Sequence, residues 1–126
     1  AEHPEVTIIG CGPLLHEALK AAKQLETQGV QVSVINSHTI KPLDTDTILN
    51  EVKKAGAVVT VEEHQAAGGF GSAVAEFLSS AHPVPIEMVA VKDQFGQSGE
   101  PEELIKHYEL DASAIKTAVE KVIKRK

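Results

Sequence analysis

The chain has 126 residues, of which 42% are hydrophobic and only 3% aromatic, so it suits one domain, residues 1–126, with an aliphatic core. The net charge of -6 argues against a nucleic-acid partner, which requires clustered Lys and Arg. The single cysteine excludes an intramolecular disulfide. No apolar run approaches the roughly 18 residues of a membrane span, so we expect no membrane partner and a cytoplasmic location.

The first part of the chain predicts a strand, a helix and a second strand. Residues 6–10 form a β-branched run that ends in glycine, and residues 30–36 alternate apolar and polar side chains. Between them, Gly29 is expected to end the helix, because glycine readily adopts the left-handed conformation that closes one. The residues expected to face inward from this helix are Leu15, Ala18, Leu19, Ala22 and Leu25.

A second helix and a third strand are predicted next. Asp44 is placed to cap the free amides at the start of the helix, and Gly56 is placed to end it. The buried stripe of this helix is expected to be Ile48, Leu49, Val52 and Ala55. Residues 57–61 (AVVTV) then show almost no polar alternation, which is typical of a strand buried on both faces of a parallel sheet.

The glycine-rich residues 68–71 lead into a third helix, which His82 and Pro83 terminate before a fourth strand at residues 86–91. The inner face of this helix is expected to be Phe70, Val74, Phe77, Leu78 and Ala81.

After a polar loop, Pro101 begins a short helix and Asp111 caps a separate last one. Its inward residues are expected to be Ile115, Ala118, Val119, Val122 and Ile123.

Strands that alternate with helices at this spacing predict an α/β fold, a three-layer α/β/α sandwich with a mostly parallel, doubly wound sheet. In such sheets, ligands and partner groups meet the carboxyl ends of the strands. Here these ends are residues 10–12, 36–38, 62–64 and 92–93, so we look for a site there.

The turn Gly10-Cys11-Gly12 imitates the start of a dinucleotide-binding fingerprint, in which glycines let a phosphate approach the amino end of a helix. The third glycine position is Leu15, and Asn36 stands where a carboxylate should bind the ribose hydroxyls. These departures favour a plain strand-to-helix turn over nucleotide binding.

Glu62, Glu63 and His64 follow the third strand and form the most chemical-looking cluster of the chain. A carboxylate beside an imidazole could orient a proton shuttle. Neighbouring residues of an extended chain point to opposite sides, however, so the three side chains cannot converge. We therefore favour an interface or helix-capping role over catalysis, and the histidine spacings predict no metal site.

Gly69, Phe70 and Gly71 precede the third helix and could cradle an anion, but no Lys or Arg stands nearby, which favours close packing instead. In the loop after the fourth strand, Asp93 and Phe95 suggest a contact surface, unless the ring folds back onto the core. These residues, with Glu62, Glu63 and His64, are the candidate interface or ligand-facing positions.

Together these segments resemble the C-terminal domain of the transketolase superfamily, from about Val6 to Val122. The marks are VTIIGCG, GVQVSVINSHTIKPLD, VVTVEEHQAAGGFGSAVAEFL and DQFGQSGEPEELIKHYELD, and the third is the most specific. The EEH, KPLD and FGQSGEP segments look more like transketolase than like the beta subunits of 2-oxo-acid dehydrogenases. Deoxyxylulose-phosphate synthase is a close relative that this comparison leaves open.

The resemblance implies a transferase of the pentose phosphate type that moves a two-carbon ketol unit between sugar phosphates. It implies that thiamine diphosphate and Mg bind between the two preceding domains of a dimeric parent enzyme, with no catalytic, cofactor or metal residue in this domain. The chain would then be inactive alone, and its partners would be those cofactor-binding domains or subunit, in a homodimer or larger oligomer. The alternative is a free-standing binding module for a small anionic or nucleotide ligand at the crevice between the first and third strands.

Overall fold

The computed structural model describes residues 3–11, 15–37, 45–63, 69–91 and 101–126, and in these ranges strands and helices alternate along the chain. The elements are β1 (Val6–Cys11), α1 (Leu15–Glu26), β2 (Val32–Ser37), α2 (Thr45–Ala55), β3 (Val58–Glu63), α3 (Gly69–Ala81), β4 (Ile86–Val91) and α4 (Pro101–Lys124). Within them, no helix combines the length and the apolar character that a membrane span requires.

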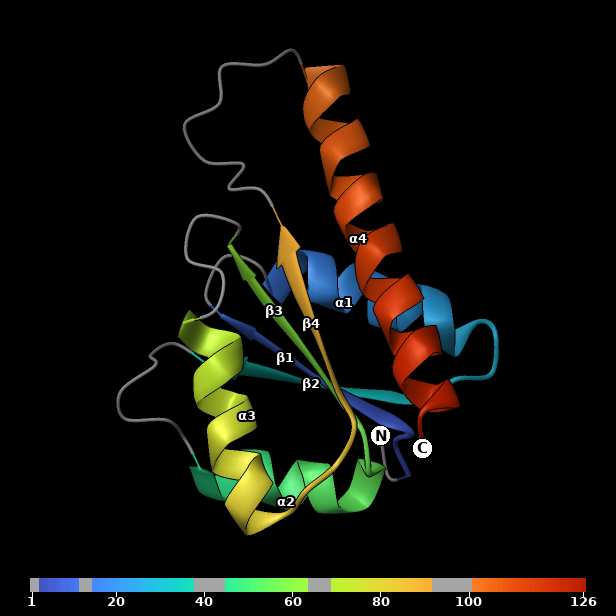
Figure 1. Ribbon diagram of the computed structural model, residues 1–126. Coiled ribbons are helices and arrows are strands. Elements are labelled where there is room, and N and C mark those ends of the chain that lie inside the picture. The colour runs from blue at the N-terminus through green and yellow to red at the C-terminus, as the bar shows by residue number, and fades with distance from the viewer. Residues whose placement is uncertain (1–2, 12–14, 38–44, 64–68, 92–100) are drawn as a thin grey trace.

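The described strands form one parallel sheet in the order β2-β1-β3-β4 (Figure 1). β1 is central, and its Ile8 lies beside Val34 of β2 on one side and Val59 of β3 on the other. The chain moves from β1 outward to β2 and then crosses back to β3 and β4, so the sheet is doubly wound. The predicted α/β/α fold class is confirmed.

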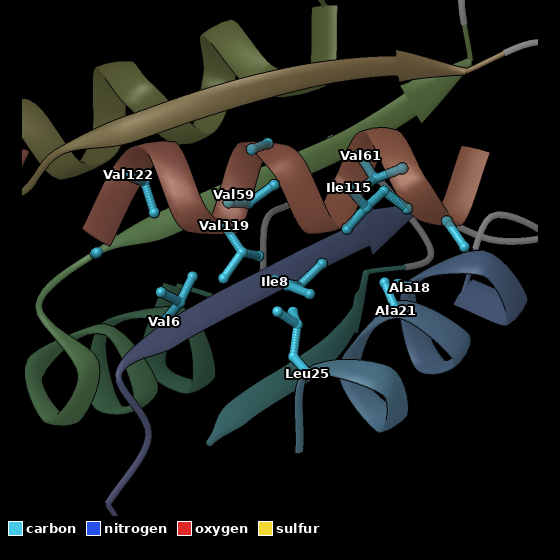
Figure 2. Close-up of a cluster of buried hydrophobic side chains, with 13 residues drawn as sticks. Val6, Ile8, Ala18, Ala21, Leu25, Val59, Val61, Ile115, Val119 and Val122 are labelled. Carbon is cyan, nitrogen blue, oxygen red and sulfur yellow. The ribbon is translucent and has the colours of Figure 1, made fainter. Parts of the chain in front are cut away.

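Helices α1 and α4 cover one face of the sheet, and α2 and α3 cover the other (Figure 1). The first face carries the α1/α4 core, part of which Figure 2 shows: Val6, Ile8, Ala18, Ala21, Leu25, Ala57, Val59, Val61, Ala112, Ile115, Ala118, Val119 and Val122. The second face carries the α2/α3 core: Ile9, Ile35, Ile48, Val52, Val58, Phe70, Val74 and Leu78.

The end of α1 explains why β2 begins at Val32 rather than two residues earlier. Gly29 has a φ of 84°, and its amide donates to the Glu26 carbonyl at 3.0 Å. The Val30 amide donates to the Leu25 carbonyl, also at 3.0 Å, which completes a Schellman cap. The side chain of Val30 packs against the α1/α4 core, so this residue belongs to the helix cap and not to the strand.

The predicted α2 and its closing glycine are confirmed. Gly56 has a φ of 78°, and Ile48, Val52 and Ala55 are buried, whereas Leu49 is only half-buried. Asp44, the predicted cap, lies outside the described residues.

The prediction of two C-terminal helices is wrong, because α4 is a single helix from Pro101 to Lys124. Asp111 lies inside this helix and does not begin a separate one. The physical reason is that residues 102–124 contain neither glycine nor proline, so no residue interrupts the helix. Of the predicted inward residues, Ile115, Ala118, Val119 and Val122 are buried and Ile123 is half-buried.

Two further inward assignments are wrong because each helix is rotated slightly from the predicted orientation. Leu19 of α1 is 51% exposed, and Ala21 is fully buried in its place. Ala81 of α3 is exposed and Phe77 is half-buried, because this helix turns Gly71 towards the sheet.

Candidate functional site

The carboxyl ends of the strands meet at one edge of the sheet, where α1 leaves towards one face and α3 towards the other (Figure 1). The described part of this edge includes the end of β1 at Cys11, the end of β3 at Glu62 and Glu63, and the first turn of α3. Because β1 and β3 are neighbours whose helices diverge, this is the switch point at which doubly wound sheets bind ligands.

Glu62 is the best-defined polar group at this edge. Its side chain is 3% exposed and lies on the α3 face of β3, two residues after Thr60. Its Oε2 atom accepts a hydrogen bond from the Phe70 amide at 2.9 Å and a second from the Gly71 amide at 3.3 Å. Both donors belong to the first turn of α3, where amides lack partners within the helix and the helix dipole favours negative charge. Glu62 therefore caps α3 from a neighbouring strand.

This cap bears on the two interpretations of the glycine-rich segment before α3. An anion cradle requires free amides at the helix start, and a buried carboxylate of the chain already occupies those of Phe70 and Gly71. A phosphate placed there would also meet the negative charge of Glu62 at close range. The arrangement supports the structural interpretation, with the helix-capping role for Glu62.

The two glycines of α3 serve different purposes. A Cβ atom at Gly71 would lie 2.7 Å from Met88 Sδ and 3.0 Å from Thr60 Oγ1, so glycine lets the helix approach β3 and β4 closely. A Cβ atom at Gly69 would meet nothing within 4 Å, and this residue is exposed. Gly71 thus lies at a close contact of helix on sheet, whereas Gly69 lies in open space.

Of the remaining candidate interface or ligand-facing residues, one has a described side chain, and it is buried. The ring of Phe70 is 2% exposed and packs in the α2/α3 core, so only its main chain could contact a ligand or partner. Glu63 ends β3, but its side chain is not among those described. His64, Asp93 and Phe95 lie outside the described residues.

Sequence reasoning missed Glu17, a second buried carboxylate at the same edge. Glu17 lies in the first turn of α1 and is 3% exposed. The signal was available, because an acidic residue in the first turn of a helix complements the helix dipole. Both helices that diverge from the switch point therefore have a buried carboxylate at their start, which disfavours phosphate-bearing ligands there.

The chemistry of the described residues does not fit a bound Mg ion or diphosphate. No group of three His, Cys, Asp or Glu side chains in the described ranges could hold a metal ion. The amides of α3 that could bind a diphosphate accept Glu62 instead.

A cavity of about 590 Å³ lies away from the switch point, along the outer side of β2. Its walls include Leu19 of α1, Asn36 of β2 and Thr47 of α2. Ser33 and Glu51 also line it, and the Ser33 hydroxyl donates to Glu51 Oε2 at 2.9 Å. The crevice between β1 and β3, where the binding-module alternative places its ligand, is not this cavity.

The fold and this edge define a class: a doubly wound α/β domain that lacks the dinucleotide fingerprint and caps its switch-point helix with its own carboxylate. The sequence model of the family described as "Transketolase, C-terminal domain" matches residues 1–115. The chain belongs to this family, as its sequence motifs predicted.

Curated relatives agree with this assignment. The chain is 42% identical over 125 residues to the 6-deoxy-6-sulfo-D-fructose transketolase subunit SqwH of Clostridium sp. (strain MSTE9), covering 99% of this chain and 39% of that protein. It is 40% identical over 120 residues to transketolase-like protein 2 of Mus musculus, covering 94% of this chain and 19% of that protein. The chain thus spans well under half the length of either relative.

A solved structure described as "Split gene transketolase, inactive beta4 tetramer" matches with a TM-score of 0.80 and 41% identity. The match covers 98% of this chain and 40% of that one. This neighbour and the curated relatives show that the chain corresponds to one part of larger transketolase-type proteins.

Proposed function

We propose that this chain is the non-catalytic C-terminal domain, residues 1–126, of a thiamine-diphosphate-dependent transketolase, and that it serves assembly, dimerisation or regulation of the parent enzyme. The observation that carries the proposal is the 42% identity to a transketolase subunit over 99% of the chain. The reaction of that parent enzyme would be the transfer of a two-carbon ketol unit between sugar phosphates.

The hydrogen bonds of the buried carboxylate Glu62 support a non-catalytic role. A general base must reach its substrate's proton, but the Oε2 atom of Glu62 is committed to two amides of α3. Thiamine diphosphate and Mg would be held by the cofactor-binding domains or subunit of the parent enzyme. The carboxyl edge, with Glu62, Glu63, His64 and the start of α3, is the surface we propose for contact with them.

Self-association is part of the same proposal. The solved neighbour at 41% identity is described as a tetramer, which supports a homo-oligomeric state for this chain as well. Homodimer formation, a pentose phosphate substrate and a cytoplasmic location stay predictions of the sequence.

The first experiment is to sequence the source locus and express this chain together with the polypeptide encoded beside or upstream of it. Ketol transfer from a ketose phosphate to an aldose phosphate is then measured with thiamine diphosphate and Mg present. We expect activity from the reconstituted protein and none from the chain alone. An active isolated chain, or a locus without cofactor-binding domains, would contradict the proposal.

Gly69 offers a sharper test of the contact surface. A side chain at Gly69 meets nothing within 4 Å, so Gly69→Arg should leave the fold intact and obstruct only a partner that approaches α3. The matched control is Ser80→Arg at an exposed position near the other end of the same helix. We expect Gly69→Arg alone to weaken association with the cofactor-binding part, measured by sedimentation. Equal association of both variants would remove this edge from the interface.

A second candidate is a domain of 1-deoxy-D-xylulose-5-phosphate synthase. The observation that favours it is 38% identity over 113 residues to that enzyme of Halothermothrix orenii, covering 88% of this chain and 18% of that protein. The reconstituted protein is assayed for both products, and formation of 1-deoxy-D-xylulose 5-phosphate without ketol transfer would replace the transketolase proposal.

The binding-module alternative is tested on the chain alone by thermal shift with nucleotides and sugar phosphates. A ligand that binds only the native state raises the unfolding midpoint by mass action. We expect no shift, because a buried carboxylate occupies the start of α3 at the switch point.

A further inference from the structure

The amino ends of the strands, opposite the candidate site, bring the two ends of the described chain together (Figure 1). The start of β1 and the end of α4 lie side by side there, although they are far apart in sequence. Three elements besides α4 meet at this end: β1, α2 and β4.

The ammonium group of Lys126 links the start of β1 to the end of α2. The Nζ atom donates to the main-chain carbonyl of Glu5 at 3.0 Å and to that of Ala55 at 2.9 Å. Ala55 is the last residue of α2, where the carbonyls lack partners within the helix and the dipole favours a positive charge. The stem of Lys126 runs past Gly56, whose added Cβ would lie 3.6 Å from Lys126 Cε.

Arg125 fixes the position from which Lys126 reaches these carbonyls. Its Nη1 atom donates to the Ile86 carbonyl at 2.8 Å and to Glu87 Oε1 at 3.0 Å. Both acceptors lie at the start of β4, so the last turn of α4 is held on that strand by a charged side chain.

The segment before β1 is also held in place. Pro4 is buried, and the Glu5 amide donates to the Gln31 carbonyl at 2.8 Å. The Glu5 carbonyl accepts Lys126, so both main-chain polar groups of this residue are engaged. The chain therefore approaches β1 along a defined path and not as a loose end.

We propose that Arg125 and Lys126 form a strap that holds the start of β1 and the end of α2 against α4. The strap fixes the direction from which residues 3–5 enter β1. Its consequence for the joint between domains rests on the proposed function, whereas the strap itself is a property of the chain. Lys126 is a positioning residue, since it acts through the main chain of Glu5 and Ala55.

The test compares Lys126→Met with Lys124→Met in the full 126-residue chain. Both changes remove one positive charge and keep an unbranched stem, and Lys124 is an exposed residue two positions earlier, at the end of α4. Amide hydrogen exchange is followed at Glu5 and Gly56, whose N–H groups donate to Gln31 and Val52. Loss of hydrogen bonds from a charged donor should speed exchange at both amides by roughly five- to tenfold in Lys126→Met only.

Three outcomes decide the question. Selective acceleration in Lys126→Met, with recovery in Lys126→Arg, supports the strap, because arginine restores a cationic donor. Equal exchange in the two methionine variants would overturn it. Acceleration that is uniform through β3 would overturn it too, since that reports loss of global stability. None of these readouts depends on ketol transfer, so the strap and the proposed function can fail separately.

Discussion

The two faces of the sheet are built from different kinds of side chain, although the same strands supply both. Towards α1 and α4, the buried side chains that the structure describes on β1 and β3 are aliphatic: Val6, Ile8, Val59 and Val61. Towards α2 and α3, polar residues are buried among aliphatic ones: Thr7, Ser33, Thr60 and Glu62.

The comparison separates two kinds of stabilisation: burial of apolar surface on one face of the sheet, and directional hydrogen bonds on the other. The α1/α4 face is stabilised by the burial of apolar surface, which is strong but not directional. On the α2/α3 face, side chains reach helix main chain, as when Thr7 Oγ1 donates to the Glu51 carbonyl at 3.3 Å and Glu62 caps α3. These bonds set helix position, and α3 is the helix at the proposed contact edge.

The largest loss of stability is expected from truncating a buried side chain of the α1/α4 face. Leu25→Ala removes a fully buried side chain of α1 and should lower the free energy of unfolding by about 2–5 kcal/mol, because a cavity remains. Leu19→Ala on the same helix removes a side chain that is 51% exposed and should change it by no more than about 0.5 kcal/mol. Urea unfolding measures both, and similar losses would show that burial does not separate the two positions.

The next largest loss of stability is expected from removing the Glu62 cap on the α2/α3 face. Glu62→Ala leaves the amides of Phe70 and Gly71 without their carboxylate and should lower stability by about 2 kcal/mol. Glu62→Gln keeps an acceptor and should lose less. Glu76→Ala, at an exposed position of the same helix, is the control. Thermal unfolding checks the order, and an unchanged midpoint for Glu62→Ala would show that the cap contributes nothing.

A smaller effect concerns the close approach of α3 to the sheet. Gly71→Ala places a Cβ 2.7 Å from Met88 Sδ and should lower stability by about 1–2 kcal/mol. Adding Met88→Ala should recover part of this loss, because it removes the nearest atom. Gly69→Ala has open space at the first residue of α3 and should change stability by no more than about 0.5 kcal/mol. Additive effects of Gly71→Ala and Met88→Ala in a double-mutant cycle would contradict the contact.

The smallest expected effect has the opposite sign. Among the described residues, the buried Thr60 Oγ1 has no hydrogen-bond partner, so Thr60→Val should raise stability by about 1 kcal/mol. Thr7→Val loses the bond to the Glu51 carbonyl and should lower stability by about 0.5 kcal/mol. Chemical denaturation of both variants distinguishes them, and a loss in Thr60→Val would show that its hydroxyl is satisfied in solution.

Elements with strong local signals could be predicted from sequence. The fourth strand was placed at residues 86–91, as observed, and Gly29 and Gly56 end helices with positive φ. The joining of the last two helices was missed because Asp111 resembles a cap, and a cap signal cannot show whether the preceding turn is already helical.

The site was only partly predictable, because its geometry depends on contacts between elements. The alternation of a strand predicts that Glu62 and Glu63 face opposite ways, but it does not predict that Glu62 reaches an amide eight residues later. That contact depends on how closely α3 packs on the sheet, which Gly71 sets. The sequence places Glu17 in the first turn of α1, where an acidic residue is favourable. It does not predict that this side chain is buried.

The position of α4 has a consequence for how the domain is made. β1 is the first strand among the described residues, yet part of its apolar side is covered by α4, with Val119 and Val122 in the same cluster as Ile8 and Val6 (Figure 2). During synthesis, the part of this side that α4 covers stays open until α4 has been made, although α1 can already cover the rest. Parallel pairs between distant segments also form slowly. The nascent domain therefore exposes this part of its aliphatic surface until α4 has been made, and in that interval the surface is accessible to a chaperone.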